Sequence, residues 1–174
     1  MEEKKITIPV EEIVKRLSRV NENGLKLDAV VNAVVSELTK DLDEFVASIY
    51  KMISDKSVDV PDVDIEYAIL QLPCHMYFLS SKMEDLGLRE DIARGLERER
   101  YNEIFQATEG RVSDKEGAAE VGSQREALVT AVNSRAYRKV KAKLEYASAT
   151  LESLKKVLTN RISDKELTKR DTRA

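Results

Sequence analysis

The sequence predicts an all-α, elongated helical protein, and three observations support that prediction. Charged residues make up 35% of the 174 residues, whereas aromatic residues make up 5% and Trp is absent. Only six Gly and three Pro interrupt the chain. Apolar residues recur at helical spacing through most of its length. This combination is typical of long helices with exposed charged faces.

The first 57 residues are expected to form an acidic, helical N-terminal extension. Apolar residues at helical spacing predict a first helix over 10–20, and the sequence NENG at 21–24 is expected to end it. A longer helix is predicted over 25–57, because Leu, Val, Ile and Phe recur on one side of it.

A linker over 57–64, SVDVPDVD, is the predicted boundary between this extension and a core of residues 62–174. The stretch after the linker is the most apolar in the chain. It is predicted to be a buried helix that Pro73 kinks and Gly87 closes. A more charged helix is predicted to follow and to end at Gly110.

The tetrapeptide SDKE occurs at 113–116 and again at 163–166, and each copy is interpreted as a helix start. Ser followed three residues later by Glu is a capping box, in which the two side chains satisfy backbone donors. The first of these helices is expected to be soft, because Gly117 and Gly122 each cost about 1 kcal/mol relative to Ala. The basic tail TKRDTRA, 168–174, is expected to be frayed.

After Gly122, apolar residues follow a strict 3-4 spacing over three heptads. That spacing predicts a long C-terminal amphipathic helix packed along its length against another helix, in a helix-packed homo-oligomer. The expected oligomerisation residues are those of this seam: Tyr137, Val140, Leu144, Ala147, Leu151, Leu154 and Leu158. The spacing leaves open whether the seam packs within one chain or between chains.

A run of cations lies beside the seam without occupying it. Between residues 135 and 143 there are five cations and no anion, where a merely solvated helix face would mix signs. These candidate contacts for a phosphate backbone are Arg135, Arg138, Lys139, Lys141 and Lys143. The alternative is that they form only the solvated side of a packing helix.

A second basic stretch, LERERYNEIF at 96–105, combines guanidinium groups with rings that can stack on unpaired bases. Its candidate DNA-binding residues, with one from the preceding turn, are Arg94, Arg98, Arg100 and Tyr101, and Phe105 follows one turn later. Glutamates are interleaved with these cations, so a self-neutralised surface is the stronger alternative here.

The chain is electrically polarised. Residues 135–174 carry 12 Lys or Arg against 5 Asp or Glu, a net charge of +7, so residues 1–134 carry −10. This split makes a second kind of protein plausible: a helical structural or adaptor protein whose basic helix meets an acidic partner, or the acidic front of its own neighbour.

The motifs that mark most enzymes are missing from this sequence. It has no glycine-rich phosphate loop, zinc motif or nucleophile elbow, and it has one Cys and one His. We expect no enzyme activity, no cofactor and no metal site, with Cys74 a buried apolar residue and His75 partly buried. No apolar run is long enough to span a bilayer, so we expect a cytoplasmic protein without a membrane partner.

From about Asp62 onward the chain resembles the UvsY-type phage recombination mediators. Three pieces carry the resemblance, in order: LQLPCHMYFLSSKMEDLGLREDIA, ERERYNEIFQATEGRVSDKEGAAE and SRAYRKVKAKLEYASATLESLKKVLTNRIS. Together they cover roughly the last two thirds of the chain. The acidic helices expected over 1–57 are absent from the shortest members of that family.

The resemblance implies a non-enzymatic helical homo-oligomer that takes part in DNA recombination and repair. Such a protein binds single-stranded DNA and helps a RecA-like recombinase displace single-strand-binding protein. In the family a basic Lys-x-Arg element before an aromatic residue contributes to DNA binding, and Arg98, Arg100 and Tyr101 stand at the similar place. A phage-encoded protein would act in the cytoplasm of the bacterial host.

Overall fold

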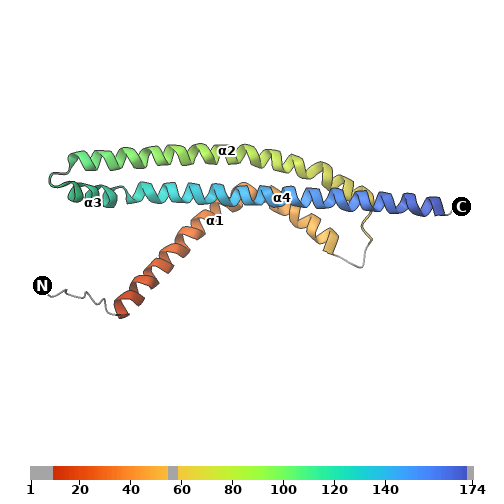
Figure 1. The fold of residues 1–174 in the computed structure, drawn as a ribbon, viewed down its shortest axis with the longest axis horizontal. Helices are drawn as coiled ribbons and strands as arrows, with labels where there is room; N and C mark the ends of the chain where they lie inside the picture. The colour runs from red at the N-terminus through yellow and green to blue at the C-terminus, as the bar shows by residue number, and fades with distance from the viewer. Residues whose placement is uncertain (1–9, 55–58, 172–174) are drawn as a thin grey trace.

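The computed structural model describes residues 10–54 and 59–171, and the secondary structure in these ranges is entirely helical. The elements are α1 (Val10–Ser54), α2 (Asp62–Ala107), α3 (Val112–Gly122) and α4 (Gln124–Asp171). The long helices α2 and α4 lie side by side and antiparallel, and α1 meets them near the middle, with both of its ends on the same side of the pair (Figure 1). The predicted all-α, elongated fold is confirmed.

One continuous hydrophobic cluster joins the three long helices. Each helix contributes residues three, four or seven apart, the spacings that keep side chains on one face. The buried members are Val31, Val35, Leu42 and Ile49 of α1, Val60 just before α2, Ile65, Ala68, Leu72, Leu79 and Leu86 of α2, and Ala136, Val140, Ala147, Leu151 and Leu154 of α4. At roughly 1.5–3 kcal/mol for each large side chain, this burial holds the helices together.

The heptad seam of α4 lies inside this cluster. All seven of its residues are buried in the cluster or pack against it: Tyr137, Val140, Leu144, Ala147, Leu151, Leu154 and Leu158. The ring of Tyr137 lies against Gly87 of α2, where an added Cβ would sit 3.5 Å from the Cε2 atom. The seam therefore packs within one chain. Oligomerisation stays a prediction, and in this conformation it needs another surface.

Two helix ends predicted at glycines are wrong. Helix α1 is continuous through the sequence NENG, and Gly24 lies in mid-helix with no atom within 4 Å of an added Cβ. Helix α2 likewise continues through Pro73 and Gly87. A single Gly costs a helix only about 1 kcal/mol, which the long apolar face of each helix outweighs.

Helix α2 ends at Ala107, three residues before the predicted stop at Gly110, and the start of α3 also differs from the prediction. Gly110 follows α2 with a φ of 123°, a left-handed conformation that side chains disfavour. The predicted capping box at 113–116 is wrong, because the carboxylate of Asp114 instead accepts a hydrogen bond from the backbone N–H of Arg111 at 3.3 Å. Helix α3 therefore begins at Val112.

The second SDKE copy, at 163–166, lies inside α4, so its interpretation as a helix start is also wrong. The helical structure is interrupted earlier, between α3 and α4, at Ser123. The hydroxyl of Ser123 donates a hydrogen bond to the backbone oxygen of Ala119 at 2.8 Å. Helix α4 also includes residues 168–171 of the tail expected to be frayed, and residues 172–174 lie outside the described part.

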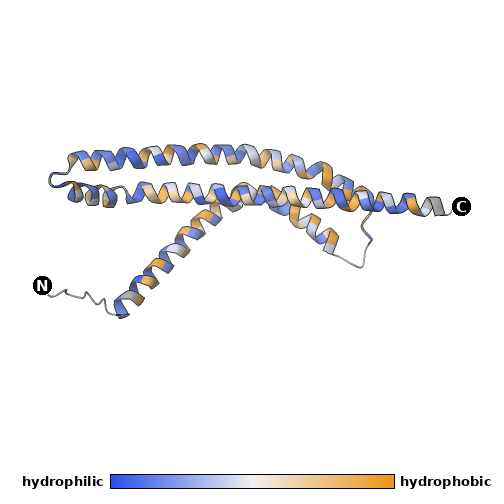
Figure 2. Ribbon diagram, in the orientation of Figure 1, coloured by the Kyte–Doolittle hydropathy of each residue, from blue (hydrophilic) through white to orange (hydrophobic). Residues whose placement is uncertain are grey.

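The two halves of α1 differ in their surroundings. From Val31 onward the apolar face of α1 packs on α2 and α4, so the predicted N-terminal extension and the predicted core share one hydrophobic cluster. Residues 10–30, here called the arm, lead away from the α2–α4 pair, which Asp28 near the end of the arm still contacts through Lys139 (Figure 1). Hydrophobic residues recur along the arm as well (Figure 2).

Candidate nucleic-acid interface

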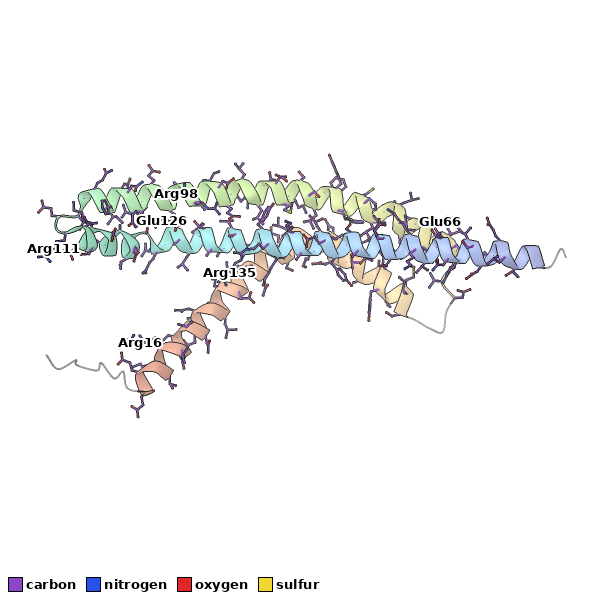
Figure 3. The ribbon with its side chains drawn as sticks, viewed as in Figure 1. Arg16, Glu66, Arg98, Arg111, Glu126 and Arg135 are labelled. Atoms are coloured by element: carbon purple, nitrogen blue, oxygen red, sulfur yellow. The ribbon has the colours of Figure 1, made fainter. Side chains whose placement is uncertain are left out.

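The predicted DNA-binding residues lie in two places on the α2–α4 pair (Figure 3). Four belong to α2 (Arg94, Arg98, Arg100, Tyr101), and five belong to α4 (Arg135, Arg138, Lys139, Lys141, Lys143). Gly87 of α2 lies against Tyr137 of α4, so these two residues are at the same level along the helix pair. Arg98 lies 11 residues beyond Gly87, so roughly 16 Å of helix separates it from the α4 group.

Two of the three arginines on α2 are paired with carboxylates. Arg94 lies 2.6 Å from Glu90, and Arg100 lies 3.1 Å from Glu103. These are exposed pairs within one helix, which are weak and which an incoming phosphate can replace. Arg98 is exposed and makes no ion pair with any described residue. The self-neutralised surface considered from the sequence is thus present at Arg94 and Arg100.

The aromatic residues of this stretch already contact one another. The rings of Tyr101 and Phe105 are stacked, with centroids 6.3 Å apart and planes 15° apart, and Lys115 of α3 lies 5.9 Å from the centroid of Phe105. Tyr101 also shares a shallow surface pocket with Arg98 and with Ser123. The structure therefore brings Arg98 and Tyr101 together. The ring of Phe105 is already in contact with Tyr101 and Lys115. Sequence reasoning missed Lys115, since only the turn between α2 and α3 brings it there.

On one side of α4, the basic run contacts α1. The Nζ atom of Lys139 lies 2.7 Å from a carboxylate oxygen of Asp28 and 2.7 Å from the amide oxygen of Asn32. Lys143 likewise pairs with Asp43 and with the hydroxyl of Thr39. Two of the five candidate phosphate contacts, Lys139 and Lys143, are therefore engaged with α1 in this structure.

The ion pair between Lys139 and Asp28 changes the acidity of the carboxyl group. The hydrogen bond and the charge of Lys139 hold the pKa of Asp28 below its ordinary value of 3.8, and the nearby charge of Arg135 lowers this pKa further. A residue of the acidic front and a residue of the basic helix, 111 positions apart in the sequence, thus pair within one chain.

On the opposite side of α4 the cations face solvent. Arg138 donates to the backbone oxygen and the hydroxyl of Ser134, both at 3.3 Å, and has no carboxylate partner. Lys141 is exposed and makes no ion pair with any residue of 10–54 or 59–171. Arg138 and Lys141, with the exposed Arg135, are the members of the basic run that remain open to a ligand.

A second set of long-range ion pairs joins the start of α2 to the end of α4. Arg161 lies 3.3 Å from Asp62, and Lys165 also pairs with Asp62. Hydrogen bonds from Lys165 and Arg161 hold the pKa of Asp62 below 3.8. No signal in the sequence marks these residues, because their pairing depends on the antiparallel arrangement of two helices.

Three other polar groups complete the description. Cys74 is exposed, so its predicted burial is wrong, whereas His75 is half-buried as expected and stacks on Phe45 at 4.6 Å. One carboxylate oxygen of Glu126 is buried without a hydrogen-bond partner. Glu126 lies in the first turn of α4, where the helix dipole favours a negative charge.

Within the described ranges, no group of three or more His, Cys, Asp or Glu side chains is placed to hold a metal ion. None of the helices in those ranges is both long and apolar enough to cross a membrane. In comparisons with known proteins, no protein family, curated protein or solved structure matches this chain. The resemblance to recombination mediators therefore stays a prediction from the sequence.

Proposed function

We propose that this protein is a non-enzymatic recombination mediator that binds single-stranded DNA. In this role it assists the loading of a RecA-like recombinase against single-strand-binding protein. The observation that carries the DNA-binding part is the segment 135–143 of α4, which holds five cations and no anion and exposes Arg138 and Lys141 without carboxylate partners. The partner proteins rest on the sequence resemblance alone.

The two basic regions support one continuous path for a strand. Arg98 and Tyr101 offer a guanidinium group beside an aromatic ring, the pair of features that contact phosphates and bases in single-strand binding. Roughly 16–21 Å of the α2–α4 pair separates them from the level of Tyr137, next to Arg138. A few extended nucleotides cover that distance, so one strand can contact both regions.

Fluorescence anisotropy with a labelled single-stranded oligonucleotide tests this proposal. We expect binding that weakens as salt rises, with the logarithm of affinity falling by about 0.7 for each phosphate contact per decade of salt. The variant Arg138→Ala/Lys141→Ala should therefore bind more weakly and lower the salt slope by about 1.4. Arg98→Ala/Arg100→Ala should also weaken binding.

The matched control is Lys15→Ala/Lys51→Ala, which removes two exposed lysines from α1, away from both regions. This variant should bind as the unchanged protein does. Equal losses in all three double variants would show that only total charge matters. An absence of single-strand binding at low salt would remove the proposal.

One observation favours the second function, a helical structural or adaptor protein that binds no DNA. Helix α2 exposes large apolar residues, among them Leu70 and Tyr77, on the face that no other described helix covers. Large exposed apolar faces of this kind mark protein interaction surfaces. Light scattering with and without an oligonucleotide separates the two functions, since an adaptor would assemble identically in both samples.

A further inference from the structure

Helix α2 is apolar on two opposite faces. The inner face, which includes Leu72 and Leu79, is buried against α1 and α4. The outer face lies about half a turn away around the helix axis, since residues two apart differ by about 200°. We define it by six side chains that are each 54–73% exposed: Tyr67, Leu70, Tyr77, Leu88, Ile92 and Leu96.

The outer face is large enough for a stable interface. At roughly 100 Å² for each of these half-exposed large side chains, the six present on the order of 600 Å² of apolar surface. A standard protein interface buries about 800 Å² per partner, including its polar rim. Monomeric proteins rarely leave a patch of this size uncovered.

The arm of α1 carries a second uncovered apolar face. Val14, Leu17 and Val20 recur at three-residue spacing and are 54–66% exposed. They lie on the same side of α1 as Val31 and Val35, which are buried in the core. The arm therefore continues a packing face beyond the point where its own chain covers it. Figure 2 shows hydrophobic residues recurring along the arm.

We infer that the outer face of α2 receives the arm of a second copy of this chain. The arm cannot reach its own outer face, because α1 is one continuous helix held at Val31 and the outer face points away from the core. From residue 67 to residue 96 the outer face is roughly 45 Å long, and the arm of residues 10–30 is roughly 30 Å long. One arm thus covers most of one outer face.

The charges favour the arm of a second copy, rather than the α2 of a second copy, as the partner of the outer face. Within the span of the outer face, residues 67–96, Lys82 pairs with Asp41 of α1 and Arg94 pairs with Glu90. The remaining charges are three acids, Glu84, Asp85 and Asp91, against one base, Arg89, so two outer faces would repel each other. Between Val14 and Val20 the arm carries Lys15, Arg16 and Arg19 and no acid. Opposite charges around two apolar faces favour docking of arm on α2. Reciprocal exchange of arms closes a two-fold pair.

Cys74 supplies the test, because this exposed thiol is the only cysteine and lies on the outer face between Leu70 and Tyr77. A Leu17→Cys variant places a second thiol on the apolar face of the arm. Mild oxidation should then give covalent dimers in which peptide mapping joins position 17 to Cys74. The matched control is Glu22→Cys, which places the thiol on the opposite, polar face of the arm and should give far less product.

Both substitutions are at exposed helix positions, so circular dichroism should show unchanged helicity. A 17-to-74 linkage within a single chain would overturn the inference, as would links joining only 17 to 17 or 74 to 74. A monomer without cross-links would overturn it too. A monomer that co-sediments with anionic phospholipid vesicles, and loses this in Leu17→Glu, would assign the arm to a lipid surface instead. None of these outcomes depends on DNA binding.

Discussion

The inner and outer faces of α2 have nearly the same apolar content, yet only the inner face is covered. On the inner face Leu72 is fully buried, whereas Leu70, two residues earlier, is 69% exposed. Both faces repeat at helical spacing, so periodicity alone treats them alike. The difference shows that a regular apolar stripe predicts packing without telling which stripe the same chain fills.

The cations of α4 show the same division into a covered and an open side. Lys139 and Lys143 contact carboxylates of α1, whereas Arg138 and Lys141 face solvent. Helix α1 thus covers both an apolar and a basic strip of its own chain. The surfaces that remain open, on α2 and on α4, are the ones that can bind a partner.

Truncation of one leucine from each face of α2 should produce the largest contrast in stability. Leu72→Ala should lower the free energy of unfolding by about 2–5 kcal/mol, because it leaves a cavity in the core. Leu70→Ala should change that free energy by no more than about 0.5 kcal/mol at a concentration where the protein is monomeric. Urea denaturation followed by circular dichroism measures both. Equal losses would mean that the outer face is covered in the monomer.

Replacement of the mid-helix glycine of α1 should have an intermediate effect. Gly24→Ala should stabilise the arm by about 1 kcal/mol, since Ala is the better helix former and an added Cβ meets no atom within 4 Å. Hydrogen exchange should show slower exchange of the amides of residues 10–30. Unchanged exchange there would indicate that the arm is not helical in solution, contrary to a continuous α1.

Removal of the acids that cover Lys139 and Lys143 should have a smaller effect, on DNA affinity. Asp28→Asn/Asp43→Asn leaves both lysines without a counter-charge, so we expect single-stranded DNA to bind a few-fold more tightly. The salt slope should steepen by up to about 1.4 if both lysines then contact phosphates. Anisotropy titrations over a range of salt concentrations measure both quantities. The control Glu37→Gln/Glu44→Gln removes two acids of α1 that do not contact these lysines.

The smallest expected effect is the pH dependence of the Asp28 and Asp62 contacts. Folding lowers the pKa of both carboxyl groups below 3.8, so their contribution to stability is present above that pH and is lost as pH falls through the lowered values. Thermal melting of the unchanged protein and of Asp28→Asn should therefore differ more at pH 5 than at pH 2. A difference that grows on acidification would contradict this assignment.

The sequence predicts the parts of this fold that depend on local pattern. The 3-4 spacing from Tyr137 to Leu158 correctly identifies a packed helix, and Gly110 lies in the turn that follows α2, three residues beyond its end. The helix ends predicted at Gly24 and Gly87 are wrong, because the free-energy cost of one glycine is small beside the packing energy of a helix of more than 40 residues. Local signals therefore overestimate the number of helix ends.

The candidate site is harder to predict, because it depends on which helices meet. The sequence identifies the basic run of α4, but nothing in it places Asp28 beside Lys139, 111 residues away. The same holds for Asp62 with Lys165. Whether a cation is open or covered is a property of the tertiary arrangement, so sequence reasoning could name the nine candidate DNA-binding residues without telling which are accessible.

The most direct test of the account compares Leu154→Asp with Leu70→Asp by light scattering and circular dichroism. Leu154 is 2% exposed within one chain, so Leu154→Asp should lose helicity and the cooperative thermal transition. Leu70→Asp should keep both while its mass falls toward the 19.7 kDa of one chain. If Leu154→Asp instead keeps its helicity and becomes monomeric, the seam of α4 lies between chains, and the division into a covered inner face and an open outer face is wrong.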